Sequence, residues 1–206
     1  MAVMVETPRE AFQPISGDEP KTEFEQLCRD LEEANEHLPL GYRAEIIGGK
    51  IVMSPWSKAG YNRILDSLQD QLTAHVPKGH RARTTPNLYV FPQQERGYGP
   101  DLHVSDHGAL EDLGTILLPG STLSLVAEQT STSTRSNDLT DKVNAYGKGE
   151  VPVYVLIDMQ KGMVTVYHDP TPDEGYRAHT QVKFGDRVHI PAPFGFELNT
   201  EGWKAC

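Results

Sequence analysis

The chain has 206 residues, with 29 acidic and 19 basic side chains and a formal net charge of −10. This excess of acid argues against a protein that coats nucleic acid through bulk electrostatics. The two cysteines, Cys28 and Cys206, exclude a disulfide framework or a zinc cluster. No apolar run approaches the ~18 residues of a membrane-spanning helix, and no basic start followed by an apolar stretch indicates a secretory signal. We therefore expect a cytoplasmic protein without membrane contact.

Basic side chains gather in one quarter of the chain. Residues 51–100 carry six basic and three acidic side chains, and each of the other quarters is net acidic. A solvated surface explains such a segment, and a phosphate-contacting patch is the alternative. Three of these side chains are candidates for substrate binding: Arg63, Arg81 and Arg83.

The chain order predicts helices and strands without an internal repeat. Residues 1–21 are polar, with Pro and Gly, and indicate a flexible tail before a single domain over 22–206. Apolar residues at three- and four-residue steps predict helices over 23–37, 57–76 and 138–148. Gly48-Gly49 predicts the turn of a hairpin formed by 42–47 and 50–53. Further extended segments are expected at 82–90, 101–105, 123–127, 151–157, 163–168, 176–182 and 188–190.

Three acids lie on predicted strands or at their ends: Glu45, Asp101 and Glu128. Lys142 lies on the predicted helix that follows Glu128. Any one acid alone is explained as a surface carboxylate, a helix cap or half of an ion pair. Two acids on neighbouring strands repel each other unless a cation or a proton lies between them. A divalent ion with hard oxygen ligands, Mg²⁺ or Mn²⁺, resolves this conflict and can activate water.

Five segments of the chain match the pattern of one family in order and spacing: 42–55, 100–104, 125–131, 138–146 and 151–158. They include Pro-Asp, strand-Glu-x-x-Ser, Asp-x-x-x-Lys-x-x-x-Tyr and Val-Pro-x-Tyr-x-Leu-x-Asp. With these motifs the chain resembles the Uma2 family of restriction endonuclease-like proteins, which is placed in the PD-(D/E)XK nuclease superfamily. The resemblance implies an α/β (α+β) fold with a central mixed β-sheet flanked by helices, to which an N-terminal helix and a hairpin are added.

The resemblance also implies a site and an activity. Asp101 and Glu128 would bind Mg²⁺ or Mn²⁺, with the main-chain carbonyl of Gln129 as a further ligand. Glu45 would be an additional catalytic acid, and Lys142 would stand in for the lysine that the superfamily carries directly after the strand. The implied activity is an endonuclease that hydrolyses DNA phosphodiester bonds. A homodimer is expected, because cutting both strands of a duplex often uses two active sites.

Several positions leave alternatives open. Where the superfamily has its lysine this chain has Thr130, and Gln129, Thr132 and Tyr61 stand where the family usually has an apolar residue, a Pro and a His. A nuclease-like fold that acts as a binding or regulatory module, or a metal-assisted hydrolase of a small substrate, would tolerate such changes. His103 shares the strand face of Asp101 and is a candidate contact to metal or phosphate, or a merely hydrogen-bonded histidine.

Overall fold

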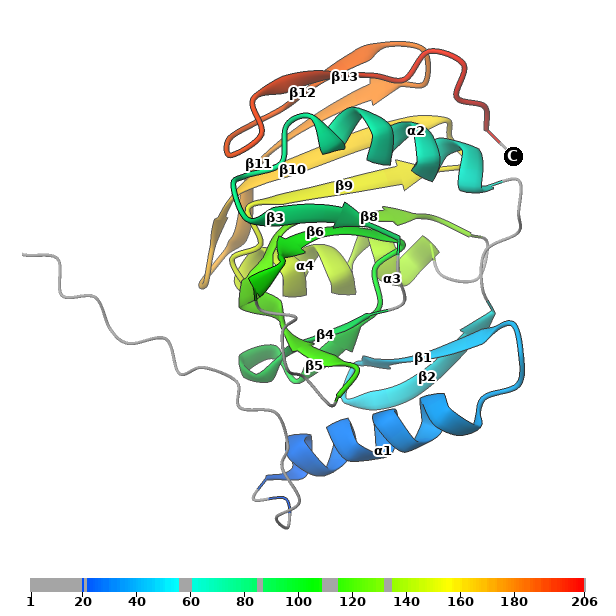
Figure 1. Ribbon diagram of the computed structural model, residues 1–206, viewed down its shortest axis with the longest axis vertical. Coiled ribbons are helices and arrows are strands. Elements are labelled where there is room, and N and C mark those ends of the chain that lie inside the picture. The colour runs from blue at the N-terminus through cyan, green and yellow to red at the C-terminus, as the bar shows by residue number, and fades with distance from the viewer. Residues whose placement is uncertain are drawn as a thin grey trace, which may run out of the picture.

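Two large β-sheets, a two-stranded β-ribbon and the helices packed on them make up the computed structural model, which describes residues 20, 22–55, 61–84, 87–108, 115–131 and 135–205 (Figure 1). The predicted tail, apart from Pro20, lies outside the described residues, as does Thr132. None of the helices in these ranges is long and apolar enough to cross a membrane. The architecture is a mixed α+β fold with large sheets and few helices, which confirms the predicted fold class.

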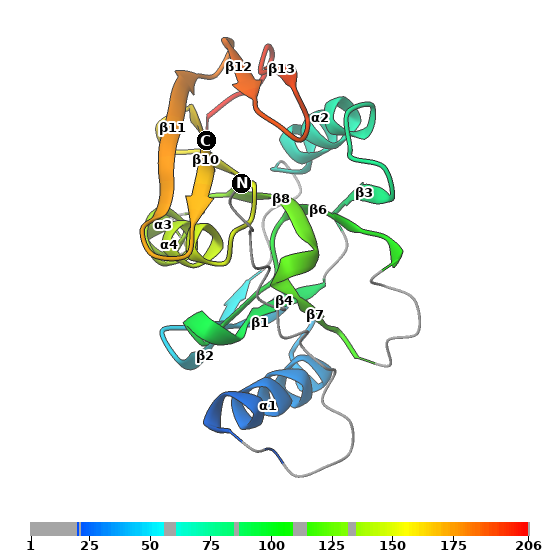
Figure 2. The same ribbon diagram turned by 90° about the vertical axis from the view of Figure 1, so that its left-hand side faces the viewer.

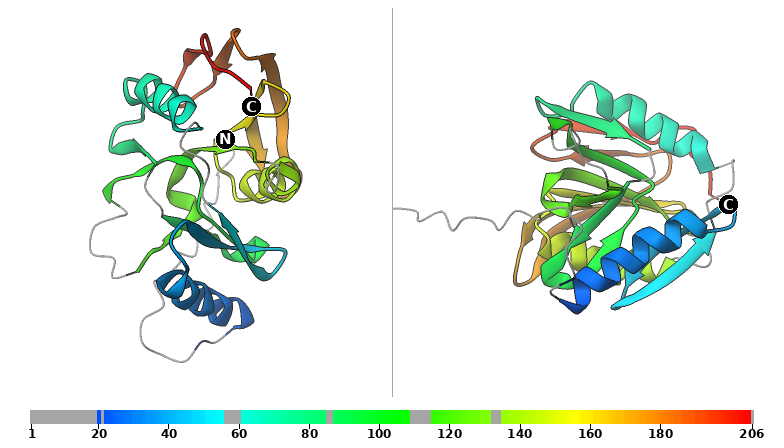
Figure 3. Two further views of the ribbon diagram at one scale, coloured as in Figure 1. Left: turned by 90° about the vertical axis from the view of Figure 1, so that its right-hand side faces the viewer. Right: turned by 60° about the horizontal axis from the view of Figure 1, so that its bottom comes forward.

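The smaller sheet has five strands and carries helix α1 (Glu23–His37) on the side away from the larger sheet (Figure 3). A capping box starts α1, because the Thr22 hydroxyl accepts a hydrogen bond from the Glu25 amide and the Glu25 carboxylate accepts one from the Thr22 amide. The strand order is β2 (Lys50–Pro55), β1 (Tyr42–Ile47), β5 (Arg96–Tyr98), β4 (Leu88–Phe91) and β7 (Leu117–Pro119). The predicted hairpin is confirmed as β1–β2, with positive φ at both turn glycines.

The larger sheet has six strands and is mostly antiparallel. Its order is β11 (Gly175–Lys183), β10 (Met163–Thr171), β9 (Val153–Asp158), β8 (Leu123–Gln129), β6 (Leu102–Asp106) and β3 (His80–Arg83). Only β8 and β9 run parallel to each other within it. Both are continuous apolar runs that are buried on both faces, as expected for the centre of a covered sheet.

Different elements cover the two faces of the larger sheet (Figure 2). Helix α2 (Asn62–Thr73) and the ribbon of β12 (Arg187–Ile190) and β13 (Phe196–Asn199) bury one face through aliphatic side chains. Helices α3 (Arg135–Leu139) and α4 (Asp141–Lys148) cover the other face, where an aromatic cluster also joins the smaller sheet. Single 3₁₀ turns lie at Pro92–Gln94 and Gly120–Thr122. The space between the two sheets is where the acidic residues gather.

Three details differ from the sequence prediction. The strand expected over 82–90 is two strands, β3 and β4, which pair in different sheets. The helix expected over 138–148 is broken at Thr140, whose φ of −130° is not helical, and the Tyr154 hydroxyl donates to the Asp138 carbonyl at that break. The short strands β5, β7 and β13 were not predicted, and α2 is observed from Asn62 because residues 56–60 lie outside the described part.

Candidate active site

Asp101 and Glu128 face each other because their strands are neighbours. Antiparallel pairing places Leu102 opposite Ala127, so the residues directly outside that pair, Asp101 and Glu128, lie side by side. The Gln129 amide donates a hydrogen bond of 2.8 Å to Oδ2 of Asp101. Glu128 is almost fully buried, and the Asp101 side chain is 8% exposed. The structure therefore brings together the two acids that the sequence singled out as a pair.

Glu45 reaches the same place from the smaller sheet. Its Oε1 accepts a 2.9 Å hydrogen bond from the Gly99 amide. Arg43, two residues earlier on β1 and so on the same face, donates from Nη1 to Oδ1 of Asp101 at 3.1 Å. The guanidinium also lies 3.7 Å from Oε2 of Glu45 and 4.0 Å from Oε2 of Glu128. Arg43 thus contacts three carboxylates. This role was not predicted, although the Arg-x-Glu spacing on one strand indicates that Arg43 and Glu45 share a face.

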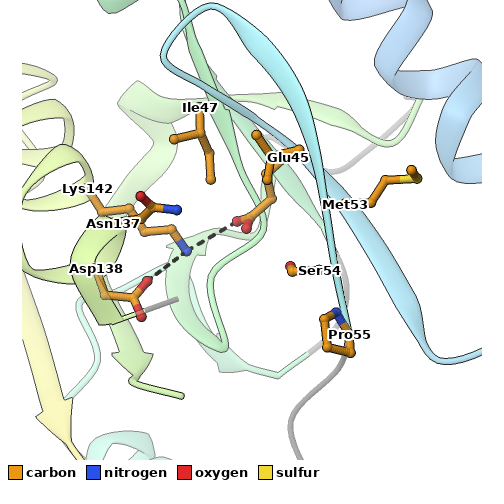
Figure 4. Close-up of a pocket in the computed structure, with 9 residues that line it drawn as sticks. Glu45, Ile47, Met53, Ser54, Pro55, Asn137, Asp138 and Lys142 are labelled. Atoms are coloured by element: carbon orange, nitrogen blue, oxygen red, sulfur yellow. Dashed lines mark ion pairs between the residues drawn. The ribbon is translucent and has the colours of Figure 1, made fainter. Parts of the chain in front are cut away.

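Lys142 enters the cluster from α4. Its Nζ lies 2.9 Å from Oε1 of Glu128, 3.2 Å from Oε1 of Glu45 and 3.4 Å from Oδ1 of Asp138. The Tyr146 hydroxyl donates to the same Oε1 of Glu128 at 2.9 Å. Figure 4 shows Glu45, Asp138 and Lys142 pointing toward one another between β1 and the helices. Asp138 and Tyr146 were not predicted to belong to the site, although both stand four residues from Lys142, the spacing of one helix face.

Four buried carboxylates therefore share two cations, Arg43 and Lys142. Burial would lower the pKa of Lys142, but the three carboxylates around it outweigh burial and hold its pKa above the ordinary value. Burial likewise opposes ionisation of Glu45, yet Lys142 and Arg43 hold its pKa below the ordinary value. Burial raises the pKa of Glu128, and the charges of Asp101 and Asp138 add to this effect. Negative charge is in excess at Glu128.

The cations that neutralise the paired acids are thus side chains of the protein. From the sequence, a divalent ion is expected to be needed to hold Asp101 and Glu128 together, whereas in the structure Arg43 does part of this. Among the described residues, no three His, Cys, Asp or Glu side chains form a group that could hold a metal ion. Any ion at Asp101 and Glu128 would take its remaining ligands from water or substrate, as Mg²⁺ commonly does.

The donor set nevertheless suits a hard divalent cation. Asp101 and Glu128 offer carboxylate oxygens, and Oε2 of Glu128 receives no hydrogen bond from any residue within the described ranges. Nη2 of Arg43 lies 4.0 Å from this oxygen, and Nζ of Lys142 lies 2.9 Å from Oε1 of the same carboxylate. An oxygen with unused acceptor capacity in a cluster of excess negative charge is a good ligand for a cation. The residues present fit such an ion.

The other predicted site residues lie apart from this cluster or serve it differently. The Gln129 side chain packs against Met159, while its amide holds Asp101. His103 is fully buried, and its Nδ1 shares a hydrogen bond with the Tyr89 hydroxyl, which comes from the smaller sheet. This agrees with the hydrogen-bonded alternative, and a contact of His103 to metal or phosphate stays a prediction. Arg63 is exposed on α2, and Arg81 is exposed on the edge strand β3.

Arg83 and Thr130 both have partners within the protein. Arg83 is half-buried and bonds to the His107 ring. Thr130, at the superfamily's lysine position, bonds to Gln160 and to the Met159 amide.

A family model described as "Uma2: Putative restriction endonuclease" matches residues 22–201. The chain belongs to the Uma2 family. No curated protein sequence matches it. This Uma2 chain is similar in fold to a crystal structure of a putative nuclease belonging to DUF820 from Anabaena variabilis, with a TM-score of 0.59 and 18% sequence identity over 79% of this chain and 89% of that one. At such low identity the likeness concerns the fold.

Proposed function

We propose that this Uma2 protein is a divalent-metal-dependent endonuclease that hydrolyses DNA phosphodiester bonds. The observation that carries the proposal is the meeting of Asp101 and Glu128 from adjacent strands, in a cluster where four carboxylates share two cations. Membership of a family described as restriction endonuclease supports the same class of reaction. The family description names neither the ion nor the substrate, so both belong to the proposal.

Asp101 and Glu128 are the proposed ligands of Mg²⁺ or Mn²⁺, with the Gln129 carbonyl as a further oxygen. Such an ion, when bound, lowers the pKa of a water molecule and offsets the charge that develops on a phosphoryl oxygen. The Gln129 amide fixes one Asp101 oxygen at 2.8 Å, and Arg43 fixes the other at 3.1 Å. The protein thereby orients this carboxylate in advance, which avoids the cost of ordering it during the reaction.

Lys142 is proposed to hold the acids in place and to stabilise negative charge. Its raised pKa keeps it protonated, so it cannot accept the proton of the attacking water. Its contacts to Glu128 and Glu45 hold these two carboxylates, which come from different sheets, next to each other. Glu45, tied to the Gly99 amide and to Lys142, is proposed as a positioning acid. The exposed Arg63 and Arg81, together with Arg83, are proposed contacts to the DNA backbone.

Cleavage of supercoiled plasmid tests the proposal. We expect nicking with Mg²⁺ or Mn²⁺ and none with EDTA. Glu128→Gln and Asp101→Asn should each lower the cleavage rate by more than about 100-fold. Loss of a metal ligand should cost more than loss of a hydrogen-bond partner of a ligand, which costs ~10–100-fold. Asp106→Asn, an exposed acid at the far end of β6, is the matched control and should cleave like wild type.

Two further measurements make the result decisive. Glu128→Gln should not lower the melting temperature, because it removes one charge from an over-acidic cluster. Calorimetric titration with Mn²⁺ should show binding to wild type and much weaker binding to the two site variants. Equal cleavage by wild type, the two site variants and the Asp106→Asn control would contradict the proposal. Absence of both Mn²⁺ binding and cleavage in wild type would instead favour a binding module without turnover.

A further inference from the structure

A pocket of about 100 Å³ opens beside the acidic cluster, between the β1–β2 hairpin and helices α3 and α4. One part of its wall is polar and comes from Glu45, Ser54, Asn137, Asp138 and Lys142. The other part is apolar and includes Ile47, Val52 and Pro55. Figure 4 shows the labelled members of both walls around one space, and nothing in the nuclease proposal uses Ser54, Asn137 or the apolar wall.

Ser54 is the first sign that the pocket takes a ligand. The residue is 8% exposed, and its hydroxyl forms no hydrogen bond with any residue in the described part of the chain. A buried hydroxyl without a partner costs free energy, so such a group is expected to have a binding role. The Asn137 side-chain amide, which is half-buried, also lines the pocket. Two neutral groups that can both donate and accept are therefore available.

Charge and size limit what the ligand can be. Two carboxylates and one ammonium group line the pocket, and the ammonium group already contacts Glu45, Glu128 and Asp138. A phosphate group would be repelled there, whereas an uncharged ring with polar edges would not be. A closed cavity of about 150 Å³ holds benzene. This pocket of about 100 Å³ is smaller but open on one side, so it has room inside for at most one six-membered ring whose edge reaches the opening.

We propose that this pocket binds a single-ring nucleobase, a pyrimidine, from an unpaired nucleotide of the substrate strand beside the cleaved bond. The proposal rests on the nuclease function proposed above and names the substrate feature that this site recognises. Ser54 and Asn137 hydrogen-bond the polar edge of the base, as such side chains do in base recognition. Ile47, Val52 and Pro55 contact the face of the ring. An enzyme that takes a base out of the stack selects unpaired or distorted sites, where unstacking costs least.

Methyl NMR without any divalent metal tests this pocket apart from catalysis. The δ1-methyl signal of Ile47, in the pocket wall, is the reporter, and that of the buried Ile190 on β12 is the internal control. We expect deoxycytidine or thymidine at millimolar concentration to shift the Ile47 signal in a saturable way. Deoxyadenosine should bind more weakly, and inorganic phosphate should leave the signal unchanged.

Two variants separate binding from folding. Ser54→Ala and Asn137→Ala should each raise the Kd for the pyrimidine nucleoside by about fivefold, the loss expected for one hydrogen bond. Ser54→Ala should melt at or above the wild-type temperature, since it removes a buried hydroxyl without a partner. The control Ser124→Ala removes a hydroxyl that donates to the Val104 carbonyl, so it should melt lower while the Kd stays unchanged.

The outcomes distinguish this proposal from the nuclease proposal. A purine that binds as well as a pyrimidine, a phosphate that shifts the Ile47 signal, or no shift with any nucleoside would overturn the pocket assignment. Plasmid cleavage without pyrimidine binding contradicts the pocket assignment alone. Pyrimidine binding without metal-dependent cleavage contradicts the nuclease proposal alone.

Discussion

At the scale of single residues, the site is a buried ionic network in which each cation serves several acids. Lys142 is 1% exposed and lies within 3.4 Å of carboxylate oxygens from Glu45, Glu128 and Asp138. Burying charges is costly unless they are paired, so removal of one of the two cations leaves several carboxylates uncompensated. Lys142 therefore has a structural role whatever its role in catalysis.

Because Lys142 is shared by these carboxylates, we expect the Lys142→Met variant to have a lower free energy of unfolding than wild type. We expect a loss of about 3–5 kcal/mol in urea denaturation, because three buried carboxylates lose their shared cation. Adding Glu128→Gln to this variant should restore part of the loss, since one of those charges is then gone. Lys148→Met, in the last turn of α4, should cost much less. If Lys142→Met is as stable as wild type, the network does not need this cation, and a cleavage defect can be assigned directly to catalysis.

At the scale of elements, an ion pair ties α4 to the smaller sheet. Arg96 on β5 donates hydrogen bonds from both Nε and Nη2 to Asp141 at the start of α4, and the Tyr98 hydroxyl donates another at 2.6 Å. Asp141 at this position also complements the positive end of the helix dipole. Burial opposes ionisation of Asp141, but the hydrogen bonds from Arg96 and Tyr98 outweigh it and hold its pKa below the ordinary 3.8.

The sign of this shift predicts how Asp141→Asn behaves with pH. A lowered pKa in the folded state stabilises the protein above the unfolded pKa, and this contribution is lost as pH falls through the folded value. At pH 7 we expect Asp141→Asn to be less stable by about 1.5–3 kcal/mol, the range for hydrogen bonds to a charged group. Urea denaturation from pH 7 down to acid should show the difference shrinking below pH 3.8. A difference that stays constant over that range would exclude the ionised Asp141 as its cause.

At the scale of the whole molecule, the candidate site lies between two sheets that have separate cores. Arg43 and Glu45 come from the smaller sheet, while Asp101 and Glu128 come from the larger one. Helix α1 packs on the outer face of the smaller sheet through Cys28 and Leu31, both fully buried (Figure 1). Docking of the two sheets is therefore required to assemble the cluster.

Cys28 offers a probe of that outer layer. Burial, together with Glu32 and Glu25, raises the pKa of the Cys28 thiol to about 12, so almost no reactive thiolate exists at neutral pH. In a Cys206→Ser variant, which leaves Cys28 as the single thiol, we expect alkylation to be very slow in buffer and to accelerate with urea in step with loss of α1 packing. Rapid labelling in buffer would show that α1 opens readily without global unfolding.

Local patterns in the sequence were sufficient for the parts of the fold that are held together locally. The capping residue Thr22 and the apolar stripe after it specify α1, and two glycines specify the hairpin turn that puts Glu45 on β1. The order of Asp101, Glu128 and Lys142 along the chain was enough to single out residues that the structure brings together. The face that a helix buries follows from such short-range periodicity, whereas the neighbours of a strand do not.

Only the tertiary structure decided which groups surround these residues. The three-residue strands β5 and β7 carry too little pattern to be found, because distant partners supply their hydrogen bonds. His103 has the Tyr89 hydroxyl from the other sheet as a hydrogen-bond partner, which its position on β6 did not indicate. Arg43 stands on the same strand as Glu45, but it meets Asp101 and Glu128 only because the two sheets pack together. The sequence determined which charges are present and which helices and strands carry them. Burial sets how strongly those charges interact, and burial depends on contacts between residues far apart in the chain.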